Sequence, residues 1–286
     1  VVVFVILHLT GNPVELMVSP TTPKEEMEIL AEEMGFNDPL PVQYVRFLKG
    51  ALVGDFGTSY YYNEPAMEVV LDRVPATLTL ACAALLICVV LGVPAGILSA
   101  VKRNSVSDAV IRVLALLGQC MPAFWLGMML IMLFAVELQW LPTGGADEGL
   151  RSLILPAFTL GLFSAATICR LLRSNMIEVL GKEYIDVCKA KGLPARKVIS
   201  KHALKNALSS ILTMLGMQFA SLLGGSVITE TVFAWPGVGR LVIQSITSSD
   251  FAVVECIVFL MAVVFVVINF VVDILYCVIN PRIRLQ

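Results

Sequence analysis

Long runs of apolar residues, each bounded by charged side chains, dominate the chain. Crossing the hydrocarbon of a bilayer takes about 20 residues of helix. Five runs meet that length and are predicted as membrane spans: Val74–Val101, Val113–Val136, Ser152–Cys169, Asn206–Thr229 and Phe251–Val278. The apolar stretch Val1–Leu9 is too short to cross alone, and we interpret it as the remnant of a truncated first span. Six spans are therefore expected in the intact protein.

The composition supports a membrane protein built of helices. Hydrophobic residues make up 58% of the chain and charged residues only 15%, whereas soluble domains carry about 25% charged residues. In a bilayer every backbone amide must be paired within a helix or a closed barrel. The apolar runs are too long and continuous for the short alternating strands of a barrel. The expected fold class is an all-α polytopic helical bundle.

The basic residues lie in alternate connections between the predicted spans. Cytoplasmic connections of membrane proteins carry an excess of Lys and Arg. The basic connections are Lys102–Arg112, Arg170–Lys205 and the tail with Arg282 and Arg284, and the others are Thr10–Arg73, Glu137–Arg151 and Glu230–Asp250. We therefore predict that the first group and both termini of the full protein are cytoplasmic, and that the second group faces outside.

The outer segment 10–73 precedes the membrane core, 74–286, and is expected to contain short helices. Thr22-Pro23-Lys24-Glu25 has the residues of a helix start, and Gly35 those of a helix end, which predicts a helix over Thr22–Met34. An amphipathic stretch follows at Val42–Leu52. The segment is either a solvated lid over the bundle or a docking surface for an external partner.

Several residues within the spans bear on helix geometry. Pro94, Pro122 and Pro156 each remove a backbone donor, so kinks or broken turns are expected there. Small residues let helices approach closely, and glycines of this kind are Gly92, Gly96, Gly118, Gly127, Gly216, Gly224 and Gly225. The seven cysteines include no C-x-x-C pair and lie mostly in apolar runs, which favours small hydrophobes over metal ligands or disulfides.

The segment 170–205 is far longer than a simple connection between two helices. Two helical pieces are predicted in it, Glu183–Lys191 and Ala195–Lys205, because Gly192 can end the first and Pro194 can start the second. The result is a basic pair of helices projecting from the cytoplasmic side.

This segment resembles the signature loop of type I ABC importer permeases, Glu-Ala-Ala-x-x-x-Gly. Asp186-Val187-Cys188 occupies the Glu-Ala-Ala positions and Gly192 the glycine. The signature continues after nine residues with Ile-x-Leu-Pro, where this chain has His202-Ala203-Leu204-Lys205, so only the Leu agrees. The form Lys201–Ala207 is similar to the dipeptide, oligopeptide and nickel permease branch.

Other stretches resemble the same branch along the whole chain. They are Gly54–Ser59, Arg73–Thr77, Leu223–Gly239, Asp273–Tyr276 and Asn280–Arg284. The resemblance implies the type I importer fold, with six transmembrane helices and a cytoplasmic coupling helix. It also implies a permease in the inner or plasma membrane of a prokaryote, working with a second homologous permease, two ATP-binding-cassette ATPase subunits and an extracytoplasmic solute-binding protein, and no nucleic acid.

The resemblance further assigns the helix near Gly192 to docking in a groove of an ATPase subunit. The candidate coupling residues are Asp186, Val187, Cys188, Lys189, Ala190, Lys191, Gly192, Leu193, Pro194, Arg196 and Lys197. The alternative for their charges is a solvated face that binds anionic lipid.

No catalytic site is predicted in the chain. It has no G-x-x-x-x-G-K-[ST] phosphate loop, and its two histidines, His8 and His202, fall on opposite sides of the predicted membrane. ATP and Mg are therefore expected on partner subunits, with no cofactor or metal in this chain.

Ionisable residues in or beside spans are candidates for function. Glu230 is one, with Trp235, Pro236 and Gly237 beside it at the outer end of a span, where a delivered solute would enter. Its alternative is an interfacial ion pair with Arg240. Glu255 and Asp273 lie within the last span, and a structural hydrogen bond is expected for Asp273.

The expected function is import of dipeptides or oligopeptides driven by ATP hydrolysis on partner subunits. Within the same branch, the alternative is import of nickel or a metal chelate, which a binding protein could deliver. An ion-coupled secondary transporter and a membrane scaffold or receptor remain as other classes. A secondary transporter would show internal repeats and ionisable relays at mid-membrane, and neither is evident.

Overall fold

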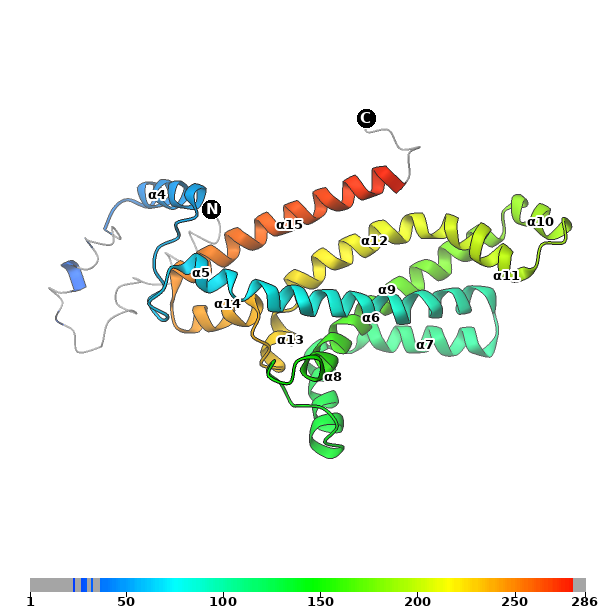
Figure 1. The fold of residues 1–286 in the computed structure, drawn as a ribbon, viewed down its shortest axis with the longest axis horizontal. Coiled ribbons are helices and arrows are strands. Elements are labelled where there is room, and N and C mark those ends of the chain that lie inside the picture. The colour runs from blue at the N-terminus through cyan, green and yellow to red at the C-terminus, as the bar shows by residue number, and fades with distance from the viewer. Residues whose placement is uncertain (1–22, 24–26, 30–31, 33–36, 280–286) are drawn as a thin grey trace. The chain divides into compact units, whose positions relative to one another are not determined.

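The chain folds as helices throughout the part of it that can be described. The structure is a computed structural model, and it describes residues 23, 27–29, 32 and 37–279 (Figure 1). Within those residues the only β pairing is an isolated bridge between Thr58 and Pro65. The predicted remnant Val1–Leu9, most of the predicted helix Thr22–Met34 and the tail after residue 279 lie outside the described residues, although 27–29 and 32 are helical.

The described chain divides into two units. The first takes in the residues up to Thr77 and Pro236–Val264. It contains α4 (Leu40–Val53), α5 (Ala66–Leu71), the start of α6 (Val74–Val101), α14 (Val238–Thr247) and the first half of α15 (Phe251–Ile279). Its core joins the outer segment to α14 and α15 through Phe56, Val70, Leu241, Val253 and Ile257.

Asp250 fixes the outer segment to the start of α15. Its carboxylate is fully buried. It accepts hydrogen bonds from the Ser59 hydroxyl, from the backbone N–H of Tyr61 at 3.4 Å and from that of Val253 at 3.4 Å. A carboxylate at this position satisfies backbone donors that the first turn of a helix leaves open.

The second unit takes in Leu78–Trp235 and the residues from Phe265 onward. It contains most of α6, then α7 (Val106–Cys120), α8 (Ala123–Leu130), the π-helix η1 (Ile131–Glu137), α9 (Leu150–Leu180), α10 (Glu183–Ala190), α11 (Ala195–Lys197), the π-helix η2 (Val198–Ala203), α12 (Leu204–Gly225), α13 (Val227–Val232) and the end of α15. Its core centres on α9, where Ile168, Leu172 and Met176 are fully buried.

Glycines bring α6 and α9 into close contact, as expected for Gly92 and Gly96. A methyl group added at Gly92 would lie 2.7 Å from the carbonyl oxygen of Ala165, and one added at Gly161 would lie 2.7 Å from that of Ala84. Both separations are closer than a methyl group tolerates. The backbones of α6 and α9 are therefore in direct contact, through Gly92 of α6 and Gly161 of α9.

The break expected at Pro122 is confirmed. The run Val113–Val136 is divided between α7, which ends at Cys120, and α8 with η1, and the chain bends by 104° between them. Met121 is extended (φ −76°, ψ 126°) because it precedes Pro122, whose ring disfavours helical geometry in the residue before it. The helix that contains the predicted span Ser152–Cys169 is longer than that run, since α9 extends from Leu150 to Leu180.

The other two prolines do not break their helices. Pro94 lies inside α6 and Pro156 inside α9, and both helices continue past them. The bounds of α6 coincide with the predicted run Val74–Val101, and α15 extends one residue beyond Phe251–Val278. In the part of the chain that is described, three helices are long and apolar enough to cross a membrane, and two bent pairs would raise this to five.

Candidate functional site

The candidate coupling residues lie on α10 and the turn that follows it. Lys182 is extended and precedes the first turn of α10, which carries Glu183 and Asp186, while Lys189 lies in the last turn. Acidic residues near the N-terminus and basic ones near the C-terminus of a helix both interact favourably with its dipole. This charge order explains how so short a helix forms at this position.

A Schellman motif ends α10. The N–H of Gly192 donates to the carbonyl of Lys189 at 2.9 Å, and the N–H of Leu193 donates to that of Cys188 at 3.3 Å. Gly192 has a φ of 73°, and a methyl group added there would meet nothing within 4 Å. The glycine is thus required for its left-handed backbone, not for space. The predicted turn at Gly192 is confirmed.

The second predicted helical piece, Ala195–Lys205, does not end at Lys205. It begins directly after Pro194 as α11, widens into η2 and continues into α12 without a loop. The coupling turn is therefore bounded by two long helices, α9 and α12, each reaching it from the core of the same unit (Figure 1).

One face of this turn is anchored in the core of the second unit. Ile185 and Ala203 are fully buried, and Val198 is nearly so, in the cluster that includes Met176. The Tyr184 hydroxyl accepts a hydrogen bond of 3.0 Å from the side-chain amide of Asn206 on α12. Burying a side chain such as Ile185 contributes about 1.5–3 kcal/mol, so α10 is held firmly against α9 and α12.

The opposite face carries the predicted coupling residues. Those exposed to solvent are Asp186, Val187, Lys189, Ala190, Lys191, Gly192, Pro194, Arg196 and Lys197, and the partly buried ones are Cys188 and Leu193. Lys189 pairs with Asp186 at 2.9 Å on this surface. Lys182, just before α10, pairs with Glu178 at 2.9 Å, and that hydrogen bond raises the pKa of the Lys182 ammonium group.

A buried ion pair in the same unit was not predicted from the sequence. Asp108, at the start of α7, is fully buried and accepts two hydrogen bonds from the Arg173 guanidinium, at 2.8 and 2.9 Å. The Ser99 hydroxyl donates to it at 2.5 Å and the Asn104 N–H at 3.0 Å. The pair therefore ties the C-terminal half of α9 to the first turn of α7 and, through Ser99, to the end of α6.

A sequence signal for the fixed position of Asp108 does exist. Ser105 is the N-cap of α7, and its hydroxyl accepts the N–H of Asp108 at 3.3 Å. A serine followed three residues later by an acidic residue is the pattern of a capping box. The pattern places Asp108 in the first turn of α7. Its partner Arg173, 65 positions away, cannot be predicted from a single sequence.

The outer candidate residues divide between the two units. In the second unit, Glu230 is fully buried and accepts a hydrogen bond of 2.9 Å from the Ser226 hydroxyl. Its carbonyl accepts the N–H of Trp235, which is 5% exposed. In the first unit, Gly237 directly precedes α14 and Pro236 comes before it. A role for these four residues in the solute path stays a prediction, as does the pairing of Glu230 with Arg240.

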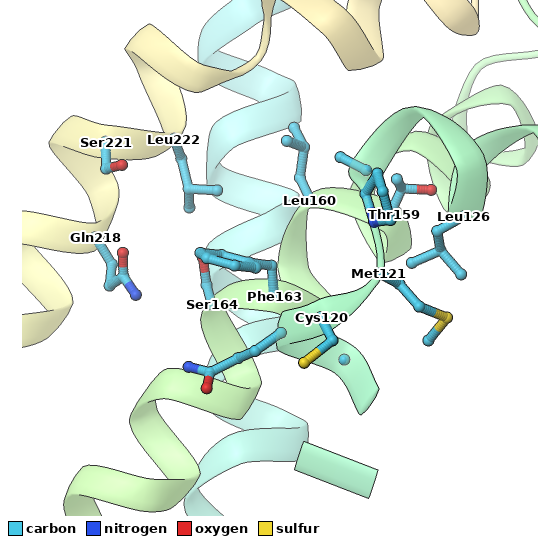
Figure 2. Close-up of a pocket in the computed structure, with 14 residues that line it drawn as sticks. Cys120, Met121, Leu126, Thr159, Leu160, Phe163, Ser164, Gln218, Ser221 and Leu222 are labelled. Atoms are coloured by element: carbon cyan, nitrogen blue, oxygen red, sulfur yellow. The ribbon is translucent and has the colours of Figure 1, made fainter. Parts of the chain in front are cut away.

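A cavity of about 390 Å³ lies between α7, α8, α9 and α12 of the second unit (Figure 2). Its polar lining residues are Gln119, Thr159, Ser164, Gln218 and Ser221, and the rest are apolar or sulfur-containing. The sequence analysis described these spans as nearly free of charge and singled out none of the five polar residues. Within the described part of the chain, no group of three or more His, Cys, Asp or Glu is arranged to hold a metal.

Two family descriptions match the chain. Residues 92–285 match "Binding-protein-dependent transport system inner membrane component". Residues 1–81 match the N-terminal part of the same kind of component.

Curated relatives and solved structures agree with that match. The chain is 40% identical to the glutathione transport system permease protein GsiC of Escherichia coli (strain K12), over 99% of this chain and 93% of that protein. It is 41% identical, over the same shares, to GsiC of Salmonella paratyphi A. An inward-facing MetNI methionine ABC transporter has a chain with a TM-score of 0.65 at 19% identity, covering 75% of this chain and 97% of that one. An amino acid ABC transporter with histidines gives a TM-score of 0.55 at 18% identity, covering 76% and 94%. The fold is that of a type I importer permease.

Proposed function

Because the chain belongs to the family of binding-protein-dependent transport system inner membrane components, and is thus an ABC importer permease, we propose that its solutes are short peptides or peptide-like molecules. The relatives at 40–41% identity are named as glutathione permeases. Glutathione is itself a small peptide, so the names of these relatives support the peptide class of solute over others.

Nickel or a metal chelate is less well supported as the solute than a peptide. The GsiC relatives are named for glutathione, and no observation among the described residues points to metal. An ion-coupled secondary transporter and a scaffold are set aside because the family is one of binding-protein-dependent transport.

The chain is a transport subunit and not an enzyme, and we propose that it works without binding nucleotide itself. ATP and Mg would be held by two ATPase subunits, a second permease would complete the pathway, and an external binding protein would deliver the solute. The chain is a membrane component, and the basic segment 170–205 supports a cytoplasmic location of that segment and of both termini of the full protein.

The coupling turn supports a mechanism by which motion of the ATPase subunits would reach the helices of the permease. The exposed face of α10, with Asp186 and Val187, would dock in a groove of an ATPase subunit. The buried face of α10, centred on Ile185, would pass the motion of that subunit to α9 and α12. A turn packed this firmly would move with the helices beside it, which is what a rocking of the permease between inward-open and outward-open states requires.

Uptake by the reconstituted complex tests the proposal. The permease, its partner subunits and the binding protein are placed in proteoliposomes with ATP, and uptake of radiolabelled glutathione, radiolabelled alanylalanine and nickel-63 is measured. Uptake of either peptide that depends on both ATP and the binding protein is expected. Uptake of nickel alone, or uptake driven by an ion gradient without ATP, would overturn the proposal.

A further inference from the structure

The cavity between α7, α8, α9 and α12 has the polar groups of a binding site but lacks ionised ones. Its lining contains no Asp, Glu, Lys, Arg or His. Figure 2 shows Gln218 and Ser221 of α12 facing Phe163 and Ser164 of α9 across the cavity, with Cys120 at the end of α7 near Phe163 and Met121, which follows α7, on the side of Leu126. Such a lining offers a solute hydrogen bonds and no fixed charge of either sign.

Three of the polar side chains have no hydrogen-bond partner among the described residues. They are the hydroxyls of Ser164 and Ser221 and the amide of Gln218. Ser164 is only 2% exposed, so its hydroxyl has little to meet except the contents of the cavity. By contrast, Thr159 in the same lining donates to the carbonyl of Leu155 at 2.9 Å, as hydroxyls in helices commonly do.

Unpaired polar groups are costly inside a membrane protein. An amide or hydroxyl without a partner in an apolar environment loses about 1–3 kcal/mol by protein mutational data. Ser164 is nearly buried and Gln218 is half-buried, so a molecule that enters the cavity, such as water or a passing solute, can supply the partner that each lacks within the chain.

Gln119 is held in a fixed orientation at the edge of the cavity. Arg170 donates to its carbonyl oxygen, and its amide nitrogen donates to the Thr167 hydroxyl at 2.9 Å. One N–H of this amide is left over, because an amide nitrogen has two. Arg170 and Thr167 thereby act as positioning residues for a donor at the cavity wall.

The bend between α7 and α8 adds backbone groups to the same place. Cys120 ends α7 and Ala123 begins α8, and both line the cavity. The ends of helices leave carbonyls and N–H groups without partners inside the helix. The cavity is thus lined by side chains and helix ends that carry both donors and acceptors, and a peptide bond, with one of each, can pair with both.

We propose that this cavity is a station on the solute path, where Ser164, Gln218 and Gln119 bind the amide groups of the transported peptide. The proposal rests on the proposed function and assigns to it a binding site. A volume of about 390 Å³ falls in the range of small-molecule sites, about 300–1,000 Å³, and fits a peptide of two or three residues. A site that binds the amide groups common to all peptides, and that carries no fixed charge, can bind peptides that differ in their side chains.

Transport kinetics of the reconstituted complex test the site. The variants Ser164→Ala and Gln218→Leu each remove one hydrogen-bonding group, and each is expected to raise the KM for glutathione and for alanylalanine about 2- to 10-fold. Gln218→Asn keeps the amide and should stay nearer the wild-type KM. Ser174→Ala is the matched control, because Ser174 is exposed on the same helix α9 and lies outside the cavity lining; its KM should equal that of the wild type.

A second measurement does not depend on transport. Cys120 is exposed to the cavity, so a variant that retains only this cysteine can be alkylated with N-ethylmaleimide. S-Methylglutathione, which has neither a free thiol to consume the reagent nor a disulfide to react with Cys120, and alanylalanine are expected to slow the alkylation of Cys120 in the assembled complex. The double change Ser164→Ala and Gln218→Leu should remove that protection.

The two proposals fail in different ways. If the wild-type complex imports peptides while both substitutions leave the KM and the protection of Cys120 unchanged, the cavity assignment is overturned and the proposed function stands. A Cys120 that cannot be alkylated in the assembled complex would also overturn the assignment, because another subunit then fills the cavity. If the wild type imports neither peptide, the proposed function itself fails.

Discussion

Single residues act here through backbone conformation and buried charge. Gly192 takes a left-handed conformation in open surroundings, and Asp108 is a buried acceptor for the Ser99 hydroxyl, the Asn104 N–H and the Arg173 guanidinium. The first was predictable from the sequence, because a glycine followed by Leu and Pro after a short helical stretch signals a helix end. The second was not, because the partners of Asp108 come from separate turns and helices.

Replacement of Gly192 by Ala should weaken coupling and leave the protein in the membrane. A left-handed conformation costs a residue with a Cβ about 1–2 kcal/mol, so the Schellman turn would be partly lost and less ATPase should co-purify with the permease. Gly181→Ala is the control, since Gly181 has a φ of −88° and should retain wild-type co-purification. Equal yields of ATPase for the two variants would count against the role of this turn.

Asp108→Asn and Asp186→Asn should separate stability from coupling. The change Asp108→Asn would leave the Arg173 guanidinium without its carboxylate, and a loss of about 1–3 kcal/mol is expected. That is less than the loss for a fully enclosed pair, because Arg173 is 21% exposed. Thermal unfolding of the purified permease in detergent should show a lower midpoint for this variant.

The Asp186 variant should behave in the opposite way. Its partner Lys189 is 59% exposed, and exposed pairs contribute little to stability. The unfolding midpoint should therefore stay at the wild-type value while ATPase co-purification falls. A lowered midpoint for Asp186→Asn with normal co-purification would contradict the assignment of Asp186 to the docking face.

At the scale of elements, the sequence predicts helices well where charged residues flank them. The run between Arg73 and Lys102 became α6 with the predicted bounds. The run ending at Arg170 did not end there, because Arg170 and Arg173 find partners on α7, namely Gln119 and Asp108. In the sequence, a charged residue marks the end of an apolar run. In the structure, the helix continues past such a residue when its side chain has a partner on a neighbouring helix.

The α7–α8 bend shows a related limit. Pro122 was expected to kink its helix, as Pro94 and Pro156 were, yet only Pro122 interrupts one. A proline removes one hydrogen bond in each case, and whether the helix continues depends on what packs around it. That information lies in the tertiary structure and not in the local sequence.

Ile185 and Val187 provide a test of α10 as a packed element. Ile185→Ala removes a fully buried side chain and should cost about 2–5 kcal/mol locally, which loosens α10 and lowers ATP-dependent uptake. Val187 is 52% exposed, so Val187→Ala should leave the unfolding midpoint unchanged and act only on ATPase binding. Hydrogen exchange of the α10 amides should rise in the first variant and not in the second.

For the whole molecule, an ordered set of short motifs predicted the family, while the polar cavity and the ion pair at Asp108 had to come from the folded structure. Ser164 and Gln218 are single polar residues among apolar neighbours, and nothing in the sequence says that they meet. The orientation in the membrane was predicted from charge alone and is open to direct measurement.

Labelling from either side of the membrane should establish this orientation. In a variant without native cysteines, Ser200→Cys should react with a membrane-impermeant maleimide only from the cytoplasmic side, and Glu148→Cys only from the outside. Both positions are exposed, so failure to react would not reflect burial within the chain. Reaction of the Ser200→Cys variant from outside would reverse the predicted topology.

The length of α9 has a consequence for the size of the motion that the transporter needs. Its 31 residues span roughly 45 Å at about 1.5 Å per residue, whereas the hydrocarbon layer is about 30 Å thick. A rigid rod of that length, pivoting near its outer end through roughly ten degrees, carries its inner tip along an arc of roughly 8 Å. A small tilt of α9 would thus accompany a displacement of several ångströms at the ATPase. The size of that displacement depends on the length of the helix and on the angle of its tilt.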